Sequence, residues 1–380
     1  MKRKRIAIIG ANSFQDPLIR SAKKLGYETH VFAWQEGAVG ARTADHFYPV
    51  SITEKEEILA VCRRIRPDAV ATIASDLAAV TVQFLAQRLG LPGNSSACTI
   101  LTTNKYAMRQ ALEAAGIPTP RYLRLSPGDA FDPEALPYPV IVKPTDRSGS
   151  RGITKLCSPD GLMQALADAW ANSFEKRAIV EEYIEGEEFS CECISQDGRH
   201  TFLALTKKYT TGAPHFIETG HIQPAEVPAQ WQSRIVTAVF AALDALKVTC
   251  GASHAELKIT PRGQVRLIEI GARMGGDCIG SHLVPLSTGC DFVRMVTEAA
   301  AGIPLSLQKG PHFKAAAIRF VFGQKDLDRL DRIRREAPEL IRLESEMEPF
   351  THRVVDSSTR YGYYILAGDD REQIKRLLEL

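Results

Sequence analysis

The sequence predicts a mixed fold in which a parallel α/β domain is followed by an antiparallel α+β unit. Over roughly the first hundred residues, short apolar strand patterns alternate with amphipathic helix patterns. This alternation is typical of a parallel sheet with helices on both faces. After residue 140 the strand patterns recur with fewer helices between them, and a length of 380 residues leaves room for two or three domains.

The N-terminal part has the pattern of a doubly wound domain. We expect strands over residues 6–9, 28–32 and 69–73, and helices over residues 17–25, 54–65 and 78–89. The turn after the first strand, Gly10 to Phe14, lacks the three glycines of a dinucleotide fingerprint, so we do not expect NAD to bind there. The strand ends are instead expected to line a small-molecule crevice.

The middle part begins with a helix over residues 104–116, because Gly116 and the prolines after it form a stop signal. Further helices are expected over residues 161–171 and 233–246, and strands over residues 140–143, 178–182, 188–195, 202–205, 255–259 and 265–270. From residue 314 onward, short strand patterns mix with charged helices over residues 326–335 and 371–378. This tail is expected to form a small terminal lobe.

Composition argues against several classes of protein. The 47 basic and 45 acidic residues leave a net charge of +2, which offers no electrostatic case for nucleic acid or an anionic membrane as partner. No stretch approaches the roughly 18 apolar residues of a spanning helix, and the basic start lacks the apolar region of a signal peptide. The eight cysteines form no CxxC pair and are expected to be reduced core residues of a cytoplasmic protein. The tryptophans are expected to be packing residues.

Two glutamates are expected to face each other on a hairpin. If residues 255–270 turn at Arg262 and Gly263, Glu256 lies opposite Glu269, with Cβ atoms roughly 4.5–5.5 Å apart. Like charges in this position repel unless a cation lies between them. A hard divalent ion such as Mg²⁺, which binds carboxylate oxygens, is the simplest explanation for the pair. The alternative, in which both glutamates point to solvent on an edge hairpin, stays open at this point. The buried face would carry Leu257, Ile259, Ile268 and Ile270.

Three further features favour a nucleotide ligand. Arg273 follows the hairpin among glycines that allow the backbone to approach a ligand closely. The loop from Ser148 to Gly152 offers backbone amides between two strands, and Lys143 ends the strand before it. Together with the two glutamates, these residues indicate a nucleoside triphosphate that is bound with magnesium.

The ordered series of motifs resembles the ATP-grasp superfamily over nearly the whole chain. The series consists of Asn104-Lys105, residues 140–144 with the Ser/Gly loop, residues 180–189, Glu256, and residues 268–273. The resemblance implies an ATP-grasp fold with an N-terminal Rossmann-like (pre-ATP-grasp) domain over residues 1–103. It also implies an ATP-grasp domain over residues 104–312, with a lid subdomain over about 122–204. A C-terminal lobe would cover residues 313–380.

The resemblance also implies roles for individual residues. Lys105 and Lys143 would contact the phosphates of ATP, and Arg273 would stabilise an acyl phosphate and its tetrahedral successor. Glu256 and Glu269 would bind Mg²⁺, with Mn²⁺ as an alternative. The rest of ATP would be bound by Ser148, Gly149, Ser150 and Gly152 in the mobile loop, Glu181, Glu182, Tyr183 and Ile184 in the adenine hinge, and Glu188 at the ribose. The family usually has Asn where this chain has Gly271, which leaves the number of magnesium ions open.

Three segments, residues 207–225, 251–256 and 275–283, are similar to those of L-amino acid ligases, which make dipeptides. The similarity implies an ATP-dependent carboxylate-amine ligase that forms an amide through an acyl phosphate, with Lys143 and Arg273 as catalytic residues. The substrate contacts would come from Lys208, His221, His254, Gly275, Gly276 and His282.

The same resemblance leaves two alternative functions open and indicates the partners of the protein. One alternative is an ATP-grasp enzyme that activates bicarbonate or formate. A nucleotide-binding module without turnover is less favoured, because Glu256, Glu269 and Arg273 are intact. The expected partners are a small-molecule carboxylate and an amine, and the resemblance leaves a homodimer open.

Overall fold

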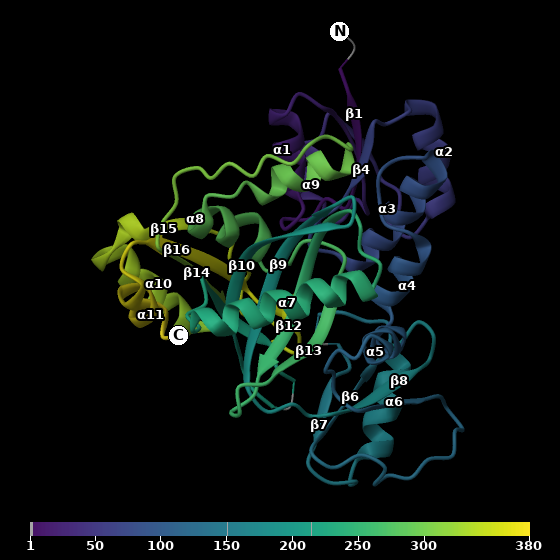
Figure 1. Ribbon diagram of the computed structural model, residues 1–380. Coiled ribbons are helices and arrows are strands. Elements are labelled where there is room, and N and C mark those ends of the chain that lie inside the picture. Colours follow the sequence, from purple (N-terminus) through teal and green to yellow (C-terminus); the bar gives the residue numbers. More distant parts are fainter. Residues whose placement is uncertain (1–2, 150, 214) are drawn as a thin grey trace.

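Three β-sheets organise the chain (Figure 1). The computed structural model describes residues 3–149, 151–213 and 215–380, so Ser150 of the expected phosphate loop lies outside the described residues. In Figure 1 a parallel sheet lies at the top, a small antiparallel sheet at the bottom right, and a large antiparallel sheet between them. The mixed α/β architecture predicted from the sequence is confirmed.

The N-terminal sheet is parallel, in the order β3-β2-β1-β4. Alternate residues of β1 point to opposite faces, so Ile6 and Ile8 pack toward α1 and α9, whereas Ala7 and Ile9 pack toward α2 and α3. The short edge strand β3 and helix α9 were not expected from the sequence. The elements are β1 (Arg5–Ile9), α1 (Asp16–Lys24), β2 (Glu28–Phe32), β3 (His46–Tyr48), α2 (Lys55–Ile65), β4 (Ala69–Ala71), α3 (Asp76–Leu89) and α9 (Phe292–Ala300).

A small antiparallel sheet, in the order β5-β8-β6-β7, forms the part of the chain that is expected to be the lid, and α6 packs on it. Its strands end at residue 182, because the next two strands pair with the large sheet instead. The expected lid over about 122–204 includes β9 and part of β10, which belong to the large sheet, because a strand's apolar pattern does not show which sheet it joins. The elements are α4 (Ser96–Thr103), α5 (Lys105–Ala114), β5 (Tyr122–Leu125), β6 (Val140–Pro144), β7 (Thr154–Leu156), α6 (Leu162–Asn172) and β8 (Ala178–Glu182).

The large sheet has eight strands in the order β13-β12-β9-β10-β11-β14-β16-β15. Strands of the C-terminal lobe extend it through the antiparallel pair β11 and β14, so the lobe shares a sheet with the middle of the chain. Helix α7 covers one end of the sheet, and α10 and α11 cover the other. The elements are β9 (Glu187–Gln196), β10 (Arg199–Thr210), β11 (Glu218–Gln223), α7 (Ala229–Ala245), β12 (Gly251–Ile259), β13 (Val265–Gly271), α8 (Val284–Thr288), β14 (Ala315–Val321), α10 (Gln324–Glu336), β15 (Ile341–Glu344), β16 (Gly362–Gly368) and α11 (Arg371–Leu378).

One apolar cluster joins the N-terminal domain to the large sheet. It contains Ile8 of β1 together with Ile194 of β9, Ala252 of β12 and Phe292 of α9. Burial of apolar surface contributes roughly 25 cal/mol of stabilisation per Å². Separating the two parts would expose this shared core, so the core favours one arrangement of them. The ends of the parallel strands are thereby kept against the large sheet, where the candidate site forms.

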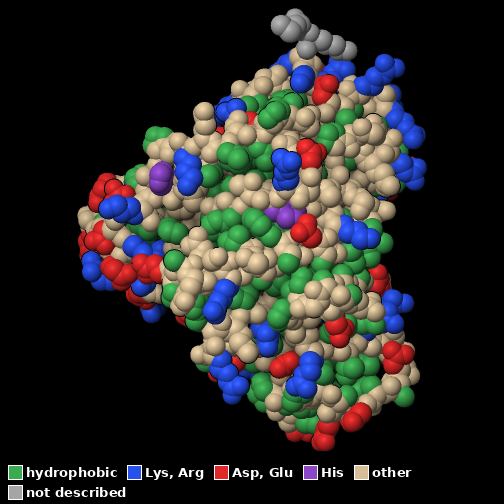
Figure 2. All heavy atoms as spheres, viewed as in Figure 1, with side chains coloured by type: hydrophobic (Ala, Val, Ile, Leu, Met, Phe, Trp, Pro, Cys, Tyr) green, Lys and Arg blue, Asp and Glu red, His purple; other side chains and the backbone are tan. Residues whose placement is uncertain are grey.

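Charged residues of α10 form an exposed pair, Arg334 with Asp331, and a buried pair, Arg329 with Asp326. On α10, Arg334 contacts Asp331 at 2.8 Å, and Arg329 contacts Asp326 at 2.6 Å. Figure 2 shows acidic and basic side chains intermingled over this end of the molecule. Among the described residues, no helix combines the length and the apolar character needed to cross a bilayer.

Candidate functional site

The two glutamates of the β12–β13 hairpin are cross-strand partners. Glu256 lies opposite Glu269, and His254 opposite Gly271, as the spacing predicts. A bulge after Glu256 then shifts the register by one residue, so Leu257 faces Leu267. The buried face of β13 therefore carries Leu267 and Ile270, and the expectation that Ile268 belongs to the core is wrong. A bulge inserts one residue that strand alternation does not reveal.

Each glutamate of the pair is neutralised by a lysine. The Nζ of Lys105 lies 2.9 Å from Glu269 Oε1, and it also donates to the Arg147 carbonyl at 2.6 Å. Lys208 Nζ lies 2.5 Å from Glu256 Oε1. The two carboxylates therefore lie beside cations that also suit phosphate oxygens, in the way that a shared metal and nucleotide site requires.

Lys208 sits at the centre of three carboxylates. Besides Glu256, it lies 3.3 Å from Glu188 and 3.8 Å from Glu218. Burial would lower the pKa of Lys208, but Glu256, Glu188 and Glu218 raise it well above its usual value. Lys208 is therefore a permanent cation, and it places the expected ribose carboxylate, Glu188, next to one of the expected metal ligands.

A buried ionic triad links the lid to α5. Glu181 on β8 contacts Arg109 Nε at 2.7 Å and Lys143 Nζ, at the end of β6, at 2.6 Å. Burial would raise the pKa of Glu181, but Arg109 and Lys143 lower it to about 2. Burial lowers the pKa of Lys143, against the attraction of Glu181. Because Arg109 also donates to the Ile268 carbonyl, the triad ties the small sheet to the β12–β13 hairpin.

Replacing Glu181 by Gln is expected to lower the free energy of unfolding by about 3 kcal/mol, because two buried cations lose their counter-charge. The stabilisation is present above the usual pKa of 4.5 and is lost as the pH falls toward about 2. The difference between wild type and variant in urea unfolding should therefore shrink over that range. The control is Glu182→Gln, whose exposed pair with Arg121 should matter by less than about 1 kcal/mol. Equal stability of the two variants would contradict the triad's role.

The segment after β8, the expected adenine hinge, has a backbone donor without a hydrogen-bond partner among the described residues. In the described part of the chain, no hydrogen bond involves the Ile184 N–H, whereas those of Glu182 and Tyr183 donate to Arg121 and Pro139 carbonyls. Lys155 and Lys258 lie over the Tyr183 ring, with Nζ 3.7 and 4.6 Å from its centre. The Glu181 carboxylate is paired with Arg109 and Lys143. A base at this hinge would therefore be contacted by backbone groups.

Arg273 is held by an aspartate from the N-terminal domain. Asp76, the first residue of α3, accepts two hydrogen bonds from its guanidinium at 2.8 and 2.9 Å. Burial would raise the pKa of Asp76, but Arg273 lowers it. A Cβ at Gly271 would lie 3.1 Å from Asp76 Oδ1 and 3.3 Å from Arg273 Cζ, so the ion pair fills the space beside Gly271.

A cavity of about 490 Å³ lies where the N-terminal domain meets the large sheet. Its lining brings together eight of the predicted site residues, from the phosphate loop, β10, β11, β12 and the segment after β13. These eight residues are Ser148, Gly149, Lys208, His221, His254, Glu256, Arg273 and Gly276. Lys105 and Lys143 are not among its lining residues: Lys105 pairs with Glu269, the cross-strand partner of Glu256, and Lys143 pairs with Glu181. The expected crevice at the ends of the parallel strands is also part of this lining, through Gly10, Ala33 and Ala74.

His254 bridges two carboxylates at the cavity wall. Its Nδ1 lies 2.6 Å from Glu192 Oε1, and its Nε2 lies 3.4 Å from Glu256 Oε1. Burial would lower the pKa of His254, but Glu192 and Glu256 raise it to about 9. A Cβ at Gly275 would lie 2.7 Å from His254 Nδ1, so glycine is needed there for close packing.

The other two histidines that are expected to contact substrate, His221 and His282, lie in different parts of the structure. His221 on β11 is fully buried and lies 3.4 Å from Asp277, which Arg360 of the C-terminal lobe binds through both carboxylate oxygens. His282 contacts Ser281 at 2.8 Å and lines a separate surface cavity beside α1. His282 therefore lies outside the cavity that His221 and His254 line.

Several residues of the cavity were not found from the sequence. Glu218 is one of them, and it belongs to strand β11, which was not expected from the sequence. Trp34, expected to pack, is 51% exposed and lines the cavity with Glu36. Asp76 and Asp277 of the cavity lining were also missed. So were Arg109, Glu192 and Arg360, which contact Glu181, His254 and Asp277 without lining the cavity.

Comparisons with known proteins show what the chain is similar to in sequence and in fold. Residues 136–281 match the family described as an ATP-grasp domain. A D-alanine–D-alanine ligase from Hydrogenovibrio crunogenus is 28% identical over 60% of this chain and 70% of its own length. Carnosine synthase 1 from Gallus gallus is 28% identical over 81% of this chain, which spans 36% of that longer protein. The crystal structure of an L-amino acid ligase from Bacillus licheniformis superposes with a TM-score of 0.83 at 22% identity, over 100% of this chain and 97% of that one, and shows a shared fold.

Proposed function

The chain contains an ATP-grasp domain within an ATP-grasp fold, and from this premise we propose that it is an ATP-dependent carboxylate-amine ligase. The observation that carries the proposal is a cavity lined by Glu256, Lys208 and Arg273, next to which Glu269 faces Glu256 across the hairpin and pairs with Lys105. The proposed substrates are two amino acids, because amino acid ligases and dipeptide-forming enzymes are among the relatives.

ATP would lie between the lid and the large sheet. The free Ile184 N–H would donate to the base, Glu188 would accept hydrogen bonds from the ribose, and Lys105 and Lys143 would bind the phosphates. The loop around Ser148 and Gly149, which lines the cavity, would close over the phosphates. Closure of this loop excludes water, which would otherwise hydrolyse a reactive intermediate.

The residues present fit a divalent ion. Glu256 and Glu269 offer carboxylate oxygens from neighbouring positions on two strands, which is the hard donor set that Mg²⁺ prefers. A Mg²⁺ ion held there would neutralise charge on the transferring phosphoryl group. Lys105 and Lys208, which neutralise the carboxylates in this structure, would then be able to turn toward phosphate oxygens. The Asp76–Arg273 pair fills the space beside Gly271, so we propose that Glu256 and Glu269 are the principal protein ligands.

The proposed reaction joins the two substrates in two steps. A substrate carboxylate oxygen attacks the γ-phosphorus of ATP, which forms an acyl phosphate and releases ADP. The amine of the second substrate then attacks the acyl carbon, inorganic phosphate leaves, and an amide remains. Arg273 would stabilise the oxyanion formed during this attack, and no protein nucleophile takes part.

The cavity suits zwitterionic substrates because it presents charges of both signs. Arg273, Arg151 and Lys208 offer cations to a carboxylate, while Glu218 and Asp277 offer oxygens to an ammonium group. Trp34 at the wall formed by the N-terminal domain offers an apolar surface to a side chain. These residues are the ones that we propose to select the two substrates.

Replacing Asp76 by Asn is expected to lower kcat by about tenfold and to leave the KM for ATP unchanged. Asp76 orients Arg273 with two hydrogen bonds, and a misplaced guanidinium stabilises the oxyanion less well. Steady-state kinetics with varied ATP and varied substrate separate the two constants. An unchanged kcat would remove Asp76 from the positioning of Arg273.

The function is tested by measuring phosphate release from ATP and Mg²⁺ with pairs of the standard amino acids, followed by mass spectrometry of the products. Release that requires two amino acids, with a product of dipeptide mass, is the expected result. Release that depends on bicarbonate or formate would replace the proposal with the alternative ATP-grasp chemistry. Tight ATP binding without release for any acid and amine would favour a module without turnover.

A further inference from the structure

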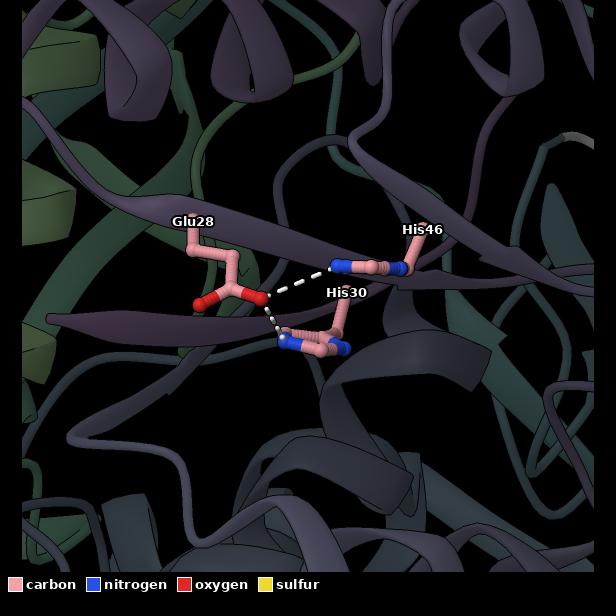
Figure 3. Close-up of side chains that lie close together, drawn as sticks. All are labelled: Glu28, His30 and His46. Carbon is pink, nitrogen blue, oxygen red and sulfur yellow. Dashed lines mark hydrogen bonds and ion pairs between the residues drawn. The ribbon is translucent and has the colours of Figure 1, made fainter. Parts of the chain in front are cut away.

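Three side chains with metal-ligating atoms meet at the outer edge of the parallel sheet (Figure 3). Glu28 and His30 lie two residues apart on β2 and therefore point to the same face of the sheet. His46, the first residue of the edge strand β3, is the register partner of His30. The group lies toward the start of β2, whereas Ala33 and Trp34, just past the end of β2, line the ATP-grasp cavity. This cluster is thus separate from the site described above.

The spacing of the three ligand atoms is close to that of a tetrahedral metal site. Glu28 Oε1 lies 2.9 Å from His46 Nε2 and 3.6 Å from His30 Nε2, and all three atoms lie within 4.8 Å of one another. A tetrahedral zinc ion, with bonds of about 2.0–2.2 Å, holds its ligand atoms roughly 3.3–3.5 Å apart. The two imidazoles stack at 14°, and the 49% exposed side chain of His46 has room to turn its ring toward a shared ion.

One ligand atom of the cluster is buried and has no hydrogen-bond partner. His30 is 4% exposed, and its Nε2 is without a hydrogen bond to any group of the described chain. Buried polar atoms in proteins nearly always have a partner. Figure 3 shows this nitrogen directed at the Glu28 carboxylate, which at 3.6 Å is too far for a hydrogen bond. The unused nitrogen therefore points into the space between the three side chains.

Outer contacts hold the ligands in orientation. The other ring nitrogen of His30, Nδ1, lies 3.0 Å from the Tyr48 hydroxyl, which leaves Nε2 for a ligand. Arg5 Nε donates to Glu28 Oε2 at 3.1 Å, which leaves Oε1 toward the histidines. Partners of this kind are typical around metal-binding histidines and carboxylates.

We propose that Glu28, His30 and His46 bind a divalent transition-metal ion of the zinc class. Two imidazoles and one carboxylate suit such an ion, whereas Mg²⁺ and Ca²⁺ prefer oxygen ligands alone. A fourth position would be filled by water, since His46 lies at the surface. The ion would join β2 to the three-residue edge strand β3, so its role is structural and does not depend on the proposed ligase activity.

The test is a zinc titration of the full chain against a chromophoric chelator, with saturating MgATP to occupy the other site. The wild type is expected to bind one zinc ion. His46→Ala, which changes an exposed side chain, is expected to weaken that binding at least tenfold, and Glu28→Gln is a second variant. His312→Ala, which changes an exposed histidine of the C-terminal half, is the matched control and should bind as the wild type does. Cobalt substitution should give the visible bands of a tetrahedral site in the wild type, and these bands should be lost in His46→Ala.

Two outcomes would overturn the proposal. The first is an affinity for zinc that is the same in the wild type, His46→Ala and Glu28→Gln. The second is zinc binding that survives in His46→Ala but is lost in Glu256→Gln, which would place the ion in the ATP-grasp cavity. Amide formation that is unchanged in His46→Ala is expected, so failure of the ligase assay would leave this test intact.

Discussion

Glu269→Gln is expected to lower the rate of ATP-dependent amide formation by about 1,000-fold. The variant keeps the shape of the side chain but loses the charge that, with Glu256, would hold Mg²⁺ at the phosphates. Loss of about 4 kcal/mol of charge stabilisation in the transition state corresponds to that factor. The measurement is the initial rate of ADP production with the preferred substrate pair, over a range of Mg²⁺ concentrations. The concentration of Mg²⁺ needed for half-maximal rate should rise.

The control for this variant is Glu336→Gln, which changes an exposed glutamate on α10 and should retain full activity. Lys105 is buried beside Glu269 and would lose its partner, so thermal unfolding of the variant is measured as well. A folded Glu269→Gln variant that turns over at the wild-type rate would contradict the metal assignment. An equal loss of activity in Glu336→Gln would show that the effect is not local.

Arg273→Met is expected to lower amide formation by about 100- to 1,000-fold, the usual cost of removing one preorganised group from an oxyanion. Arg273 lines the cavity and is bound by Asp76, whereas the expected phosphate lysines are Lys105 and Lys143. The affinity for ATP should therefore change by less than about threefold. Binding of a fluorescent ATP analogue and the rate of amide formation measure the two effects separately.

The matched control is Arg353→Met, an exposed arginine of the C-terminal lobe, which should leave both quantities unchanged. A loss of ATP affinity in Arg273→Met equal to the loss in rate would assign Arg273 to nucleotide binding. In that case the proposed role at the oxyanion would be wrong.

The parts of the site that depend on short spacings were predictable from the sequence. Glu256 and Glu269 face each other because the chain between them is a single hairpin, and alternation along two strands gives the partner of each residue. The bulge after Glu256 was not predictable, since an extra residue leaves the apolar pattern readable in either register. It explains why Leu267 replaces Ile268 in the core.

The parts that depend on distant contacts were not predictable. Asp76 meets Arg273 across 197 residues, and Arg360 meets Asp277 across 83. No local sequence pattern predicts either contact. A charged residue at the start of a helix or in a loop usually faces solvent, so its sequence position does not indicate a buried partner. Strand β11 was missed for a different reason. Its buried residues include Gly220, His221 and Gln223, which are polar or small and hide the strand alternation.

The central claim is that the chain transfers the γ-phosphoryl group of ATP to a carboxylate before the amine attacks. The most direct test uses the acid substrate with both carboxylate oxygens replaced by oxygen-18, together with ATP, Mg²⁺ and the amine. The account predicts that each amide formed releases one phosphate that carries one oxygen-18 atom, because the bridging oxygen of the acyl phosphate leaves with phosphorus. Amide formation that releases only unlabelled phosphate would contradict it.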